Sequence, residues 1–202
     1  VEFVSANPTG PLHVGHCRGA ILGDVLSNLL IFNGHFVTKE YYVNDYGVQI
    51  KNFVSSVYFR IIEIIKHKPF PDNKDLYPGD YIIDIAKEII KKNSIDNYDN
   101  LDKIFGTLSS VSLKLSMNII KKNLLCLGIS HDSFIYESDL IANKMVSKTI
   151  KKLQTSKHVY EGKLKAPKSD DSKTWKSRNQ ILFKSSVFGD DTDRALQKED
   201  KT

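Results

Sequence analysis

The chain has 202 residues, of which 41% are hydrophobic, and its formal net charge at pH 7 is +5. This length accommodates one domain, or one domain with an inserted subdomain, and the hydrophobic content is enough for a core. No apolar run is long enough to span a bilayer, which argues against a membrane protein, and the positive charge permits a polyanionic partner without requiring one.

The first elements in the chain predict the opening unit of a parallel sheet. Residues 1–5 have the pattern of a buried strand, a loop broken by proline and glycine follows, and a helix is expected over about 15–33. Residues 36–43 are rich in β-branched and aromatic side chains and predict the next strand. A β-α-β order of this kind indicates an α/β fold with ligands at the carboxyl ends of the strands. The expected helix has an apolar face made of Ile21, Leu22, Val25, Leu26, Leu29 and Leu30, and Gly19 and Gly23 allow close backbone packing.

The rest of the chain predicts a largely helical region followed by short strands. A second helix, capped by Asn44 or Asp45, has Phe53, Val57, Ile61 and Ile64 on one face. Further helices are expected around residues 82–90, 113–127 and 141–153, and short strands at 134–137, 159–160 and 181–183.

The segment around His13, Gly15 and His16 opens the first helix and suits nucleotide chemistry. A helix N-terminus presents unpaired N–H groups and a positive dipole end, where phosphates bind. Gly15 leaves room for a base or ribose, and the two histidines can donate hydrogen bonds to charge that develops on phosphate oxygens. Two ordinary capping histidines have the same pattern, but the preceding strand, the Asn-Pro-Thr-Gly-Pro loop and the long helix favour a nucleotide site.

The segment VEFVSANPTGPLHVGH, followed by Arg18 and Gly19, resembles the signature region of class I aminoacyl-tRNA synthetases, and specifically of the arginyl-tRNA synthetase family. The resemblance continues through EYYVNDYGVQI (40–50), PGDYI (78–82) and FGDDTDR (188–194), in the family's order along nearly the whole chain. It implies ATP-dependent activation of L-arginine to arginyl-adenylate, with Mg²⁺ accompanying ATP, and transfer of arginine to the 3′ end of tRNA-Arg. It also implies a cytoplasmic enzyme that is a monomer at full length and needs no membrane.

The resemblance also implies a Rossmann-like, parallel-sheet nucleotide-binding fold of the HIGH type with a largely helical α+β insertion. Residues 1–70 are then the first half of the catalytic domain, and residues 71–202 are the connective insertion and the start of the return to that domain. The family's second signature, K-M-S-K-S, is not KMVSK at 144–148, which has an extra residue and comes too early. The resemblance implies a true K-M-S-K-like loop downstream of Thr202, because family members with a degenerate loop tend to carry lysine where this chain has Gly10. We therefore expect a piece of a longer enzyme that cannot aminoacylate alone and that exposes apolar surface.

The resemblance assigns roles to individual residues. His13 and His16 are the expected catalytic residues, which stabilise phosphate charge. Glu2 is explained equally well as a charge at a strand edge. Asn44 and Asp45 are explained equally well as helix caps. The expected ATP-binding residues are Gly10, His13, Gly15 and His16; the arginine-binding residues are Glu2, Ser5, Asn7 and His13; and Asn44 and Asp45 are expected to contact the tRNA end.

Other interpretations stay open. A small H-x-G-H nucleotidyltransferase would use the same histidines, and a truncated synthetase-like module would bind ATP or RNA without catalysis. The basic segment Lys163–Arg178, with Trp175, fits an RNA contact and a plain exposed loop equally well. Cys17 and Cys126 have no metal-type spacing and predict free thiols in a reducing compartment. Asp190, Asp191 and Asp193 lack the glycine and distal glutamate of a calcium loop, so they predict a solvated turn and no metal site.

Overall fold

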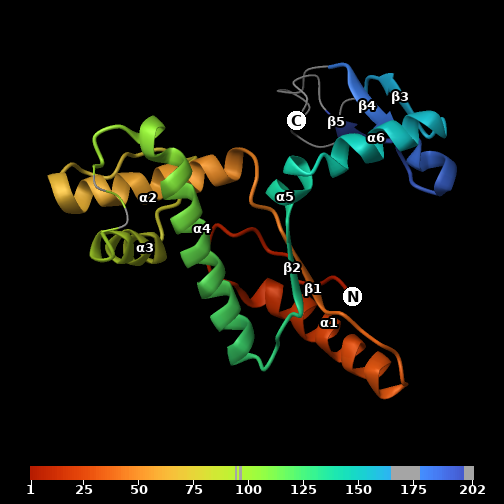
Figure 1. The fold of residues 1–202 in the computed structure, drawn as a ribbon, viewed down its shortest axis with the longest axis horizontal. Helices are drawn as coiled ribbons and strands as arrows, with labels where there is room; N and C mark the ends of the chain where they lie inside the picture. Colours follow the sequence, from red (N-terminus) through yellow and green to blue (C-terminus); the bar gives the residue numbers. More distant parts are fainter. Residues whose placement is uncertain (94, 96, 165–177, 198–202) are drawn as a thin grey trace. The chain divides into compact units, whose positions relative to one another are not determined.

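The computed structural model describes residues 1–93, 95, 97–164 and 178–197 (Figure 1). The chain forms two compact units, Val1–Asp139 and Leu140–Thr202. The first unit extends beyond residue 70 because three helices bury their faces against one another and the last of them leads back to the sheet. The division of roles at 70/71 stays a prediction. No helix in the described part is long and apolar enough to cross a membrane.

The sheet of the first unit is parallel, which agrees with the expected α/β class. Strands β1 (Glu40–Val43) and β2 (Ser133–Tyr136) pair in register, with Glu40 opposite Ser133 and Val43 opposite Tyr136. The N-terminal segment adds one isolated parallel bridge between Glu2 and Glu40. A continuous strand over residues 1–5 was therefore a wrong prediction. Val4 and Ser5 have φ of 67° and 41°, in the left-handed region, and this conformation ends the extended backbone.

Helix α1 (Val14–Phe32) matches its predicted range, but the face that it buries is not its expected apolar face. Its fully buried residues are the small ones, Ala20, Gly23 and Ser27. A Cβ on Gly23 would lie 2.2 Å from Cγ of Phe3, whereas a Cβ on Gly19 would meet nothing within 4 Å. Small residues let the segment that carries Phe3 approach the helix axis closely, and this contact selects the face. The large apolar side chains point away from it, and five of the six predicted are exposed: Ile21, Leu22, Val25, Leu26 and Leu29.

Three helices form the larger core of the first unit: α2 (Val48–Lys66), α3 (Asp80–Lys91) and α4 (Leu101–Cys126). The apolar periodicities of the sequence predicted the buried faces of α2 and α3 well, because these two helices pack against each other. Helix α4 begins twelve residues before the range expected from residue 113, and Leu108, the residue that it buries in this core, lies in the part that was not predicted. The buried members of this core are Ile50, Phe53, Val54, Val57, Ile61, Ile82, Ile85, Ala86, Ile89, Ile95 and Leu108.

The ends of these helices only partly follow the predictions. Helix α4 begins after Asn100, whose side chain accepts hydrogen bonds from the backbone N–H groups of Asp102 and Lys103, and Gly128 follows its end with φ of 73°. Helix α2 begins after Gly47, which has φ of 94° and makes no side-chain cap. Capping of α2 by Asn44 or Asp45 was therefore a wrong prediction.

A second core lies between α1, α4 and the sheet. It contains Phe3, Ala20, Tyr41, Val43, Met117, Ile120, Leu124 and Ile129. The His131 ring packs at its edge, 4.3 Å from the ring centroid of Phe3 and 5.3 Å from that of Tyr41. The Tyr41 hydroxyl donates to the carbonyl of Ala6 over 2.8 Å, which fixes the loop that leads to α1.

The second unit is a small antiparallel sheet with a helix. Strands β3 (Val159–Gly162), β4 (Gln180–Phe183) and β5 (Arg194–Gln197) pair in that order. Strand β5 was not predicted, because its four residues are mostly exposed and carry no apolar alternation. The single helix expected at 141–153 is two helices, α5 (Glu137–Ala142) and α6 (Met145–Thr155), separated at Lys144 with φ of 56°. In the basic segment, residues 165–177, including Trp175, lie outside the described residues.

Candidate functional site

The N-terminus of α1 is closed by two histidines that cap it reciprocally. His13 Nδ1 accepts a hydrogen bond from the Gly15 N–H over 3.1 Å, and His16 Nδ1 accepts one from the His13 N–H over 3.2 Å. A neutral imidazole whose Nδ1 is an acceptor carries its hydrogen on Nε2. Both rings therefore hold an N–H donor directed away from the backbone they cap, at the positive end of the helix.

The two imidazole rings stack, with centroids 3.7 Å apart and planes 28° from parallel. Burial lowers the pKa of His16 below its ordinary value of 6.5, and the neighbouring His13 lowers it further. His16 is therefore neutral at pH 7, in the form that donates from Nε2. This arrangement can donate two hydrogen bonds to one anionic group without adding a full positive charge.

The two glycines expected at a nucleotide also have packing roles inside the chain. A Cβ on Gly15 would lie 2.9 Å from Cε1 of His13, so the stacked histidine cap requires a residue without a side chain there. A Cβ on Gly10 would lie 3.0 Å from the Tyr81 hydroxyl, which donates to the carbonyl of Thr9 over 2.8 Å. Tyr81 of α3 thus fixes the loop before the histidines, a contact that sequence patterns did not reveal. The role of the glycines toward a nucleotide stays a prediction.

The residues expected to hold an amino acid lie on the strained segment before this loop. The Ser5 hydroxyl donates to Glu2 Oε1 and accepts from the Tyr42 N–H over 3.0 Å, so these two side chains are joined to each other and to β1. Asn7 Nδ2 donates to Gln49 Oε1 of α2 over 2.6 Å. Positive φ at Val4 and Ser5 is costly for non-glycine residues, and such strain concentrates at functional sites.

An acidic pair lies at the carboxyl ends of β1 and β2. Asp45 accepts from the backbone N–H of Ser138 over 2.9 Å and from its hydroxyl over 2.6 Å. Glu137 shares a hydrogen bond with Tyr42, and burial together with the charge of Asp45 raises the pKa of Glu137. A positively charged ligand group would relieve that repulsion. Sequence analysis missed Glu137, although an acidic residue at the end of a predicted strand was a usable signal.

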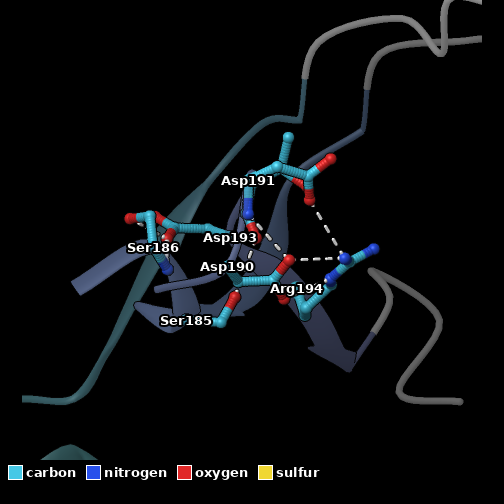
Figure 2. A network of polar contacts seen from close by, with 7 residues as sticks. Ser185, Ser186, Asp190, Asp191, Asp193 and Arg194 are labelled. Carbon is cyan, nitrogen blue, oxygen red and sulfur yellow. Dashed lines mark hydrogen bonds and ion pairs between the residues drawn. The ribbon is translucent and has the colours of Figure 1, made fainter. Parts of the chain in front are cut away.

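The three aspartates near the end of the chain form a turn with internal partners (Figure 2). Arg194 donates to both carboxylate oxygens of Asp190, from Nε over 2.7 Å and from Nη2 over 2.6 Å, and also contacts Asp191. Asp193 accepts from the Ser186 backbone N–H and hydroxyl and from the Tyr160 hydroxyl. Among the residues that the structure describes, no group of three or more histidine, cysteine or acidic side chains is arranged to hold a metal ion.

Comparisons with known proteins match nearly all of these elements. The family model described as tRNA synthetases class I (R), catalytic domain, matches residues 1–164. The arginine–tRNA ligase of Pelagibacter ubique is 59% identical over 203 residues, and that of Anaplasma phagocytophilum is 48% identical over 205; the alignments cover the whole chain and 35% of each relative. The chain thus spans about a third of the length of these relatives.

Solved structures agree with the sequence relatives. A putative arginyl-tRNA synthetase from Campylobacter jejuni has a TM-score of 0.80 and 32% identity, covering all of this chain and 40% of that protein. The arginyl-tRNA synthetase of Thermus thermophilus has a TM-score of 0.59 and 19% identity, covering all of this chain and 32% of that protein, and supports the fold alone.

Proposed function

This chain belongs to the class I arginyl-tRNA synthetase family, and from that premise we propose that it carries the ATP- and arginine-binding part of an arginine–tRNA ligase. The observation that carries the proposal is the reciprocal histidine cap of α1, with two Nε2 donors at a helix N-terminus. The whole ligase activity, with L-arginine and tRNA-Arg as substrates, is proposed for a protein of the relatives' length, acting in the cytoplasm.

In this proposal ATP lies with its phosphates at the N-terminus of α1, beside Gly10 and Gly15. A carboxylate oxygen of arginine attacks the α-phosphorus, the bond to the bridging oxygen breaks, and pyrophosphate leaves with the electron pair. The Nε2–H groups of His13 and His16 donate to the phosphate oxygens on which charge develops. Since positioning and charge stabilisation account for such catalysis, no protein nucleophile is needed. Mg²⁺ would accompany the phosphates of ATP as part of the substrate.

Arginine needs one group for its backbone end and a carboxylate for its guanidinium. We assign Asn7 to the backbone end, with Ser5 beside it. We assign the guanidinium to Glu137 in place of Glu2, because burial and the charge of Asp45 raise the pKa of Glu137 and a cation bound there would offset both effects. Asn44 remains the candidate for the tRNA end. Asp45 has both oxygens bound to Ser138, so it positions the start of α5.

Calorimetric titration of the chain with Mg·ATP tests the phosphate site. His16→Ala and His13→Asn, the second of which keeps a capping acceptor, should each weaken ATP about 10- to 150-fold, because a hydrogen bond to a charged group contributes about 1.5–3 kcal/mol. His35→Ala changes an exposed histidine beyond the other end of α1 and is the matched control. If His16→Ala and His13→Asn bind ATP as tightly as His35→Ala does, the assignment of the two histidines to the phosphates is refuted.

Titration with L-arginine tests the amino-acid site separately. Glu137→Gln should weaken L-arginine and leave ATP unchanged, because it removes the charge that faces the guanidinium while keeping a hydrogen-bonding group. Glu2→Gln is the matched control in the same unit. If Glu2→Gln weakens L-arginine and Glu137→Gln does not, the original assignment of Glu2 is correct and the assignment of Glu137 is wrong.

A further inference from the structure

The net positive charge of this chain comes from its second unit. Residues 140–202 contain 15 lysines and arginines against 8 acidic residues, a net charge of +7, whereas residues 1–139 contain 14 against 16, a net charge of −2. A small unit with this charge attracts polyanions, and nucleic-acid backbones are the polyanions that the proposed function supplies.

An exposed aromatic array stands on this basic unit. The rings of Phe183 and Phe188 are parallel to within 2°, with centroids 5.7 Å apart, and His158 meets Phe188 edge-on at 5.5 Å. Phe188 nevertheless keeps 62% of its surface exposed. The array can therefore accept one more flat ring on Phe188, which is how aromatic side chains bind unpaired nucleobases.

Hydrogen bonds on both sides of Phe188 in the sequence hold its turn in place, and Figure 2 draws Ser185, Ser186 and Asp193 among the residues that make them. Ser185 donates its hydroxyl to the carbonyl of Thr192 over 2.8 Å, and Ser186 donates its hydroxyl to Asp193 over 2.6 Å. Asp193 is held in turn by the Tyr160 hydroxyl of β3 over 2.7 Å. Since the turn is ordered before any ligand arrives, stacking on Phe188 loses little conformational entropy.

The charges around the array leave one side open to phosphates. Arg194 donates to Asp190 and Asp191, and Ser186 and Tyr160 donate to Asp193, so all three aspartates of the turn have donors. On the other side, Lys157 precedes His158 and Lys184 follows Phe183 in the sequence. The backbone N–H of Lys184 donates to the carbonyl of His158 over 2.9 Å, which places these two lysine-bearing segments side by side.

We propose that His158, Phe183 and Phe188 form a stacking platform for an unpaired base of single-stranded RNA, with Lys157 and Lys184 contacting the backbone phosphates. This inference deepens the proposed function and rests on it, since the 3′ end of a tRNA is single-stranded RNA. The occupant is RNA because the exposed tip is aromatic and the unit that carries it has a net charge of +7.

Fluorescence anisotropy with a labelled single-stranded RNA of about 12 nucleotides ending in CCA, at about 50 mM salt, tests the platform. Phe188→Ala should weaken this RNA about 5- to 150-fold, the effect of losing one base–aromatic stack. Phe36→Ala removes a still more exposed phenylalanine from the first unit and should leave RNA affinity unchanged. The same RNA paired into a duplex should be insensitive to Phe188→Ala, because its bases are not available for stacking.

Two further variants separate stacking from packing and charge. Phe188→Leu keeps an apolar side chain for packing but has no aromatic face. It should therefore lose RNA affinity as Phe188→Ala does, and it tests stacking even where the alanine variant folds poorly. Lys157→Gln with Lys184→Gln should reduce the slope of log affinity against log salt by about 1.4. Unchanged affinity for single-stranded RNA in both Phe188 variants would overturn the platform. So would variants that bind RNA normally but no longer associate with other copies of the chain, since Phe188 would then be a contact between copies. Because ATP is measured at His16 in the other unit, failure here leaves the adenylation proposal untouched.

Discussion

Replacing Gly23 by alanine places a methyl group where the Phe3 ring already lies. The added Cβ would be 2.2 Å from Cγ and 2.5 Å from Cβ and Cδ2 of Phe3, whereas carbon atoms in contact are about 3.5–4.0 Å apart. The ring must therefore move by more than about 1 Å, beyond what a packed side chain concedes. Displacing a buried phenylalanine costs about 3–5 kcal/mol, and the better helix propensity of alanine returns about 1 kcal/mol. We expect Gly23→Ala to reduce the free energy of unfolding by about 2–4 kcal/mol.

Urea unfolding followed by far-ultraviolet circular dichroism measures this loss, with Gly19→Ala as the matched control in the same helix. A Cβ on Gly19 meets nothing within 4 Å, so that variant should gain up to about 1 kcal/mol from helix propensity. In the background of Phe3→Ala, the change at Gly23 should cost less than in the wild type, because the ring is gone and only Cβ of residue 3 still lies 2.5 Å from the added methyl group. A Gly23→Ala protein as stable as the wild type would refute the argument that this glycine selects the buried face of α1.

The remaining predictions concern protonation and exposed surface. Burial lowers the pKa of His131 below its ordinary value of 6.5, so the unfolded chain takes up the proton first and the free energy of unfolding falls as the pH drops through 6.5. In urea unfolding at pH 7 and pH 5, His131→Phe should therefore lose less stability between the two pH values than the wild type does. The charge of Asp45 contributes to the raised pKa of Glu137, so an NMR titration of Asp45→Asn should show the pKa of Glu137 moving down toward its ordinary value of 4.5; an unmoved pKa would show that burial alone raises it. Polar replacements on the exposed face of α1 should reduce light scattering of concentrated samples with little change in unfolding free energy, and a large loss of stability would contradict the exposure. The positions to replace are Leu22, Leu26, Leu29 and Phe32.

The sequence was sufficient for the helices whose apolar residues face other helices. The periodicities of α2 and α3 predicted the correct buried side chains, because each of the two helices has a partner along its apolar face and burial then follows the repeat. The histidine segment was also identified correctly as the start of α1, since N-capping depends on residues within one turn.

Tertiary structure decided what depends on residues far apart in the sequence. Phe3 selects the small-residue face of α1, and the large apolar residues of that helix, which form its expected apolar face, remain exposed. Asp45 and Glu137 meet because β1 and β2 pair in parallel across ninety-odd residues, so neither residue reveals the other in the sequence. Local patterns report which residues favour burial or charge, while the identity of the group that each one meets is set by the path of the whole chain.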